Sequence, residues 1–295
     1  MKEKFDKNSA KKINIKKRVI LIFLLIILLI GILLLVVGVN NIIQVEKIND
    51  DAKNVTDQVA SDSMPIIINN LVLGATYKNT WVSSEKYYFF GNTAKGNKLD
   101  VYTENGKKGT YQIENVNKGS KSDIYITTSN INKSDEYLAI YTNEKNIMPQ
   151  PATKIESVTD EDYKIVKSAL GIYRAFNPSL KIKEAYNVYI NNANTGTVYV
   201  VSNVAGKYFG GYSAVIYKDY TGKSSIIKYS YVSNLKESSK WPVYSFKFVA
   251  DLNLDDKCEI ILQETKETEV KYDVIEFNEK NGKFVEVLSS KFDIK

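Results

Sequence analysis

Residues 250 to 263 read ADLNLDDKCEIILQ, an acidic stretch that runs directly into an apolar one. Oxygen-bearing side chains alternate with apolar ones in its first half. The second half has the aliphatic composition of a buried strand. The stretch therefore predicts a loop that leads into a strand. The loop is either a site for a hard cation or an acidic turn whose Asp and Asn side chains bond their own backbone.

The cation hypothesis rests on the spacing of the oxygen-bearing residues. Asp251, Asn253 and Asp255 stand at positions 1, 3 and 5, Lys257 at position 7 and Glu259 at position 9. Alternate side-chain oxygens, with a backbone carbonyl at the seventh position, suit Ca²⁺. Such an ion would be a structural clip rather than a catalyst, with a dissociation constant of about 0.1 to 1 mM. Cys258, within the same segment, is expected to be a buried strand residue.

The loop departs from the EF-hand pattern. Position 12 is Leu262 instead of Glu, and position 6 is Asp256 instead of Gly. Asp adopts the left-handed backbone conformation less readily than Gly. We expect strands rather than helices on both sides of the loop.

The last third of the chain contains a weak internal repeat. YSAVIYKDYTGK begins at Tyr212, and YDVIEFNEKNGK begins at Tyr272, sixty residues later. The spacing predicts two small sheets of similar layout. The loop INNANTGT of the first unit lacks carboxylates, so we expect no metal there. Chance similarity between two hairpins remains the alternative.

Residues 65 to 148 are expected to form a small antiparallel β-barrel or sandwich. Strand-like runs are separated there by Gly, Asn and Ser. The runs are IIINNLVLG, KYYFF, KLDVYTEN, GTYQIENV, SDIYITTS and EYLAIYTN. Trp81 is expected to be a core residue, with a ligand platform as the alternative.

Residues 149 to 158 are expected to be a linker, and a helix should follow it. Thr159 is a suitable amino-terminal cap, the acidic residues 160–162 complement the helix dipole, and Asn177-Pro178 should end the helix. The predicted fold is thus mainly β (α+β overall), with the helix in 159–295 packed on two β-sheet repeat units.

Residues 19 to 39 predict a membrane anchor, because VILIFLLIILLIGILLLVVGV contains no charged residue. Its 21 residues span about 30 Å as a helix, the thickness of the hydrocarbon core. Eight Lys or Arg side chains in residues 1–18 precede it, which predicts a cytoplasmic tail and an extracytoplasmic body from residue 40 to 295. A cleavable signal peptide is the alternative, but no small-residue cleavage site follows.

Residues 40 to 64 are expected to form a stalk. Its apolar residues follow a heptad-like spacing, which allows weak homodimerisation; the alternative is a solvated helical spacer. These residues are Val45, Ile48, Ala52, Val55 and Val59.

The loop resembles the D-x-N-x-D-G-x-x-D/E calcium loop of FG-GAP and VCBS-type β repeats. The whole arrangement resembles uncharacterised, membrane-anchored extracytoplasmic proteins of clostridia-like Gram-positive bacteria. The resemblance rests mainly on residues 251 to 262. It implies a calcium loop that leads into a strand, in a protein of the cell envelope.

Composition excludes several kinds of site. The chain has no histidine and one cysteine, so a Ser-His-Asp triad, a His-ligated zinc site and an internal disulfide are ruled out. The net charge of +6 equals the excess of eight basic over two acidic residues in 1–18. The remaining chain is neutral, which argues against nucleic-acid binding.

Three functions remain open. The first is a non-enzymatic binding or structural module of the cell envelope whose partner is a protein or a glycan. The second is a sensor or assembly factor that acts through a partner. The third is a cell-wall carbohydrate hydrolase with paired carboxylates. The available carboxylates include Asp160, Glu161, Asp162, Glu184, Asp251 and Glu259.

Overall fold

The computed structural model describes residues 63–90, 95–119, 123–128, 131, 136–141, 152–171, 180–191, 194–203, 211–232 and 241–293. The predicted tail, membrane span, dimerisation seam and nearly all of the stalk lie outside these residues. Within them, no helix is both long enough and apolar enough to cross a membrane. Residues 55–295 form one compact unit.

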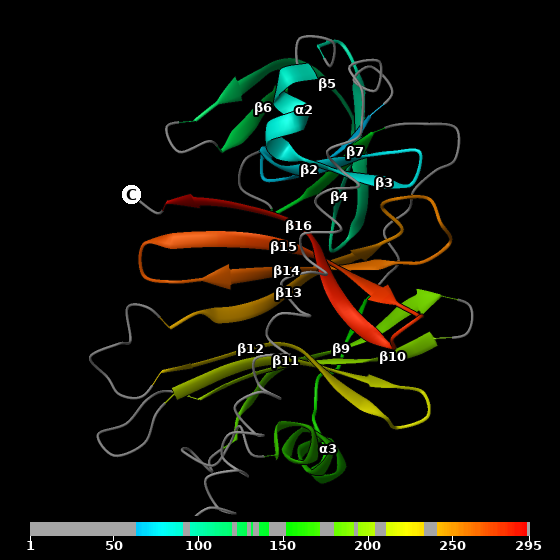
Figure 1. Ribbon diagram of the computed structural model, residues 1–295, viewed down its shortest axis with the longest axis vertical. Helices are drawn as coiled ribbons and strands as arrows, with labels where there is room; N and C mark the ends of the chain where they lie inside the picture. The colour runs from blue at the N-terminus through cyan, green and yellow to red at the C-terminus, as the bar shows by residue number, and fades with distance from the viewer. Residues whose placement is uncertain are drawn as a thin grey trace, which may run out of the picture. The chain divides into compact units, whose positions relative to one another are not determined.

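The first part of this unit is a barrel, as predicted (Figure 1). Its strands are β1 (Met64–Ile68), β2 (Leu71–Tyr77), β3 (Thr80–Ser83), β4 (Lys98–Thr103), β5 (Gly106–Lys118), β6 (Ile124–Thr128) and β7 (Leu138–Tyr141). The order β1-β7-β4-β5-β6-β2, with β1 also paired to β2, closes six antiparallel strands into a ring. β3 extends the sheet from β2.

Two tight turns shape the start of the barrel. Asn69 and Asn70, with φ of 47° and 71°, separate β1 from β2. Lys78 and Asn79, with φ of 46° and 62°, separate β2 from β3. Positive φ at both central residues is the signature of the type I′ turn, whose twist matches that of the flanking strands. The run IIINNLVLG is therefore two strands and a turn.

The expected strand KYYFF is wrong, because these residues belong to helix α2 (Ser84–Phe90). The side chain of Ser83 accepts a hydrogen bond from the backbone N–H of Lys86, at 3.4 Å, which starts the helix. Tyr87, 1% exposed, packs into the interior core of the barrel. Capping and burial therefore outweigh the β propensity of the aromatic residues.

Two further antiparallel sheets follow. The outer sheet contains β8 (Thr153–Lys154), β9 (Ile182–Asn191), β10 (Asn194–Asn203), β11 (Gly211–Asp219) and β12 (Ser224–Val232). The middle sheet contains β13 (Val243–Ala250), β14 (Glu259–Thr265), β15 (Glu269–Asn278) and β16 (Lys283–Asp293). In each sheet the last four strands pair in chain order.

The two sheets share the layout that the internal repeat predicted. Tyr212 lies on β11 and Tyr272 on β15, the third strand of each four-strand series. Gly222 and Gly282, with φ of 88° and 65°, occupy the turns before the fourth strands. An origin by duplication stays a prediction.

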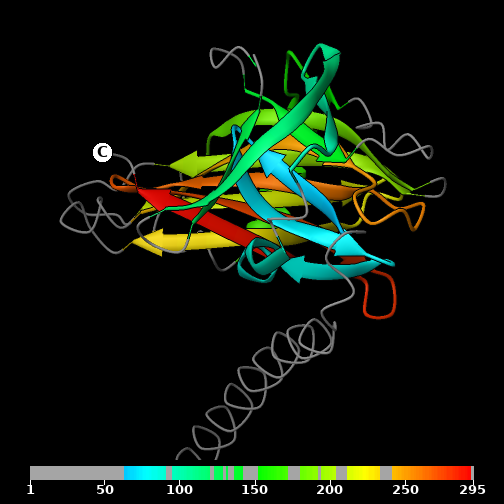
Figure 2. The ribbon, with the colours of Figure 1, turned by 90° about the horizontal axis from the view of Figure 1, so that it is seen from above.

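The middle sheet lies between the barrel and the outer sheet (Figure 1), and in the view from above the three layers overlap (Figure 2). One of its faces shares a core with the barrel, where Leu73 and Tyr102 pack with Ile261 and Leu288. Trp81 belongs to this core and donates a hydrogen bond from Nε1 to Glu276 Oε2, at 2.8 Å. The prediction that Trp81 is a core residue is therefore confirmed.

The other face of the middle sheet packs against the outer sheet. Val198 and Val215 share a core with Ile260 and Ile275. Alternate residues of β10 and β11 therefore face the middle sheet, and the residues between them face away from it.

Helix α3 (Asp160–Leu170) covers the outward face of the outer sheet. Thr159 and Asp162 form the amino-terminal capping box, which confirms the predicted cap. The helix ends at Leu170, before the predicted stop at Asn177-Pro178, and residues 172–179 lie outside the described residues. Among the described residues, its apolar side chains pack with those of the outer sheet rather than with both repeat units.

Candidate functional site

The predicted cation loop connects β13 to β14 in the middle sheet. Ala250 and Glu259 are direct cross-strand partners, so the loop from Asp251 to Cys258 closes on itself. The backbone N–H of Cys258 also donates to the carbonyl of Ile190, at 2.6 Å, which ties the loop to β9 of the outer sheet. Strands flank the loop on both sides, as expected.

Side-chain oxygens of the loop bond its own backbone. The two carboxylate oxygens of Asp251 accept hydrogen bonds from the backbone N–H groups of Asp255, at 3.2 Å, and Asp256, at 3.1 Å. Asn253 Oδ1 accepts from the Asp255 N–H at 3.1 Å. Asp255 Oδ1 accepts from the Lys257 N–H at 3.1 Å. These are the contacts that an acidic turn requires.

The backbone of the loop is left-handed at two non-glycine residues. Leu254 has a φ of 64°, and Asp256 has a φ of 66°. The D-x-N-x-D-G-x-x-D/E pattern has glycine at the position of Asp256. An Asp residue adopts this left-handed conformation at a cost in free energy that glycine does not have.

Glu259, the first residue of β14, has a feature that an acidic turn does not explain. Its side chain is 0% exposed, and Oε2 accepts a hydrogen bond from the backbone N–H of Leu252 at 2.8 Å. Oε1 is buried and has no partner among the described residues. Burial, and then the nearby carboxylates of Asp255, Glu276 and Asp251, raise the pKa of Glu259 well above its usual value.

Other titratable groups of the loop respond to the same environment. Burial raises the pKa of Asp251, and the neighbouring Asp255 adds to this effect. Burial, with the charges of Glu259, Asp251 and Asp255, raises the pKa of the Cys258 thiol to about 12. A thiol that keeps its proton is a poor nucleophile, so the loop does not provide a reactive cysteine.

The five predicted ligands therefore differ in their fit to a cation. The loop carries Asp251, Asn253 and Asp255, and Glu259 points back to it through its bond to Leu252 N–H. The Lys257 side chain lies 3.4 Å from Glu279, so only its backbone carbonyl is suited to a cation. Across the described ranges, no three Asp, Glu or Cys side chains are placed to hold a metal by themselves. An ion here would also need the Asn253 oxygen and backbone carbonyls.

The carboxylates considered for hydrolysis are spread over separate elements. Asp160, Glu161 and Asp162 lie in the first turn of α3, and Glu184 lies on β9. The carboxylate of Asp162 accepts hydrogen bonds from the Thr159 N–H and hydroxyl, each at 2.8 Å, and from the Tyr199 hydroxyl. It is thus committed to the helix cap.

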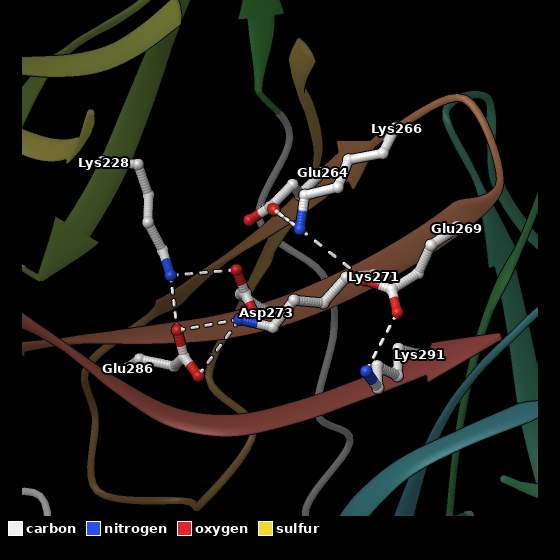
Figure 3. Close-up of polar contacts among 8 residues, drawn as sticks. All are labelled: Lys228, Glu264, Lys266, Glu269, Lys271, Asp273, Glu286 and Lys291. Carbon is white, nitrogen blue, oxygen red and sulfur yellow. Dashed lines mark hydrogen bonds and ion pairs between the residues drawn. The ribbon is translucent and has the colours of Figure 1, made fainter. Parts of the chain in front are cut away.

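A second polar cluster, which the sequence did not indicate, joins the middle and outer sheets (Figure 3). At its centre is Asp273 on β15, which is 1% exposed. Its two oxygens lie 2.9 Å from Lys228 Nζ and 2.8 Å from Lys271 Nζ. Glu286 on β16 pairs with both lysines.

The cluster continues along β14, β15 and β16 as further ion pairs. Lys266 pairs with Glu264 at 3.0 Å, and Lys291 pairs with Glu269 at 2.9 Å. The eight side chains carry equal numbers of opposite charges, so the cluster links strands without creating a charged surface.

A groove on the outward face of the outer sheet was also missed by the sequence predictions. It has a volume of about 460 Å³ and lies beside β9, β10 and β11. The available signal was the alternation of polar and apolar residues in AYNVYI and TGTVYV.

Comparison of the chain with protein families, curated proteins and solved structures finds no match.

Proposed function

We propose that the chain is a membrane-tethered extracytoplasmic module that acts in the cell envelope by binding a protein or a glycan. The observation that carries this proposal is the uncharged segment 19–39 with eight basic residues before it. Such a segment retains its positive flank in the cytoplasm and holds the following chain outside. The compact unit 55–295 is then the part that meets the envelope.

The unit 55–295 is called the head below. We propose Ca²⁺ as a structural ion of this head. The supporting observation is Glu259 Oε1, which is buried beside a loop of side-chain oxygens and has no hydrogen-bond partner in the part of the chain that the structure describes. A buried carboxylate is costly unless it is protonated or faces a cation. Asp251, Asn253 and Asp255, the carbonyl of Lys257 and Glu259 would hold the ion, which would fix the β13–β14 connection.

The binding function can be tested with the full-length chain purified in detergent. It is incubated with isolated cell walls of the producing bacterium and sedimented, and in parallel it is immobilised and exposed to solubilised envelope proteins. We expect the chain to sediment with the walls or to retain a defined envelope protein in equimolar amount. A chain that stays in the supernatant and retains no protein would contradict the proposed function.

A further inference from the structure

Helix α3 leaves part of the outward face of the outer sheet uncovered. Val166 and Leu170 of the helix pack on Tyr199 and Ile216. The Tyr199 hydroxyl donates a hydrogen bond to Asp162 in the first helical turn, so the covered region ends near this residue. Beyond it, on the same face, lies the groove of about 460 Å³. This volume is within the usual range of ligand sites.

The floor of the groove is a row of polar side chains across four neighbouring strands. Thr153 pairs with Asn187, Asn187 with Thr197, and Thr197 with Lys218. Three strand intervals of about 4.8 Å give a row of about 14 Å, the length of two to three linked sugar rings. Thr197 Oγ1 donates to Asn187 Oδ1 at 3.2 Å, and among the described residues the Asn187 Nδ2 has no partner. Asn187 is exposed, so this amide is accessible from the groove.

An exposed aromatic residue stands at the rim of the groove. Tyr220 is 68% exposed, the largest exposed fraction among the large hydrophobic side chains described. It lies in a turn that Asp219 holds rigid: Asp219 Oδ1 accepts hydrogen bonds from the backbone N–H groups of Thr221 and Lys223, each at 2.9 Å. The backbone of the turn is thus held beside the polar row, and the Tyr220 ring is exposed there.

The charge and backbone pairing of the groove narrow the class of ligand. The charges of Lys218 and Asp219 cancel within the lining. β10 and β11 are each paired on both sides, so their backbone groups are not open to an added peptide strand, whereas β8 pairs with only Tyr186 and Asn187 of β9. The lining offers hydroxyl, amide and aromatic side chains, which suit a ligand with many hydroxyl groups and apolar ring faces.

We propose that this groove binds a neutral oligosaccharide segment of an envelope polymer. The sugar hydroxyls bond the row of Thr153, Asn187 and Thr197, and one ring face packs on Tyr220. This inference rests on the proposed function, since it requires the head to lie outside the cytoplasm, and it names the glycan as the partner.

The test is calorimetric titration of the full-length chain in a detergent that has no sugar headgroup. The probes are chitotetraose, cellotetraose and maltotetraose. We expect at least one of them to bind, and Tyr220→Ala and Asn187→Ala each to weaken its affinity at least tenfold. Val243→Ala, at an exposed apolar residue of β13, and Asn115→Ala, at an exposed amide of β5, are matched controls that should bind like the wild type.

Thermal unfolding of each variant checks that it folds. The inference is overturned if no probe binds to the folded wild type, or if the folded groove variants bind as well as the controls. If isolated cell walls or an envelope protein still retain the chain in that case, the inference fails while the proposed function stands. If the head is found in the cytoplasm, the proposed function itself fails, regardless of whether the tetrasaccharides bind.

Discussion

Glu259 places a carboxylate inside the middle sheet, where it must either keep its proton or face a cation at neutral pH. One of its oxygens accepts from Leu252 N–H, and the other has no partner among the described residues. Its pKa in the folded chain is raised above the usual 4.5. Without calcium the folded state therefore binds more protons than the unfolded state as pH rises above that value, and stability falls with rising pH.

We predict that Glu259→Gln separates the effects of protons and calcium. Without calcium, the wild type should lose stability as pH rises above about 4.5, because its folded-state pKa is raised. The variant should not show this pH-dependent loss, because its amide is neutral. At pH 7, calcium at ten times its dissociation constant should stabilise the wild type by about 1.4 kcal/mol. The variant should gain clearly less in thermal unfolding. Glu267→Gln, at an exposed acid, is the control and should respond like the wild type; equal responses of all three proteins would contradict the calcium site.

Asp256 allows a second prediction at the scale of one residue. Its φ of 66° costs an L-residue about 1 to 2 kcal/mol, part of which Asp offsets. Asp256→Gly should raise the free energy of unfolding by about 0.5 to 1 kcal/mol in urea titrations, after the added freedom of the unfolded chain is counted. Glu267→Gly, at a residue without positive φ, should lower it. A loss of stability in Asp256→Gly would contradict the loop geometry.

Among the elements, helix α3 and the hairpins show what the sequence could predict. The cap Thr159 and most of the barrel strands follow from local patterns of capping, β-branched residues and turn residues. The prediction of a strand at KYYFF was wrong, because the core that surrounds a run of aromatic residues decides whether it forms a strand or a helix. Here Tyr87 fills the barrel interior from a helix. Local propensity carries no information about that interior.

The cap of α3 has a measurable effect on stability. Burial alone would raise the pKa of Asp162, but hydrogen bonds from Tyr199 and Thr159 outweigh it and hold the pKa below its usual 3.8. The cap should therefore contribute fully to the free energy of unfolding above about pH 4, and this contribution should decrease as pH falls further. At pH 7, Thr159→Ala should cost about 1 kcal/mol in urea unfolding, and Thr159→Ser should restore most of it. Equal stability of Thr159→Ala and the wild type would contradict this role.

Substitution of Asp273 tests how much the ion pairs that join β12 to β15 and β16 stabilise the chain. Removing the buried carboxylate leaves the ammonium groups of Lys228 and Lys271 with the half-exposed Glu286 as their remaining partner. Asp273→Ala should destabilise the chain by about 3 kcal/mol in urea unfolding. Glu269→Ala is the control, because its partner Lys291 is 66% exposed, and it should cost less than about 1 kcal/mol. Similar losses in both variants would mean that burial of the pair is unimportant.

For the whole molecule, the sequence predicted the class of fold but not its layers. Alternating apolar residues indicate which strands are half-buried, and the repeat indicated two similar sheets. They do not indicate that Leu73 of the barrel meets Ile261 of the middle sheet, because such contacts join residues far apart in the chain. The groove was missed for the same reason, because it lies on the part of the outer sheet beyond the first turn of α3.

The proposed function requires the head to lie outside the cytoplasm. Labelling of cysteines in intact cells tests this location directly. Cys258, buried and with a raised pKa, is replaced by Ala, and single cysteines are placed at exposed Asn105 in the head and at Ser9 in the tail. Cells that express each full-length variant are treated with a membrane-impermeant maleimide before and after lysis. We predict that Asn105→Cys is labelled in intact cells and that Ser9→Cys is labelled only after lysis. Labelling of Asn105→Cys only after lysis would place the head inside the cell and contradict the account.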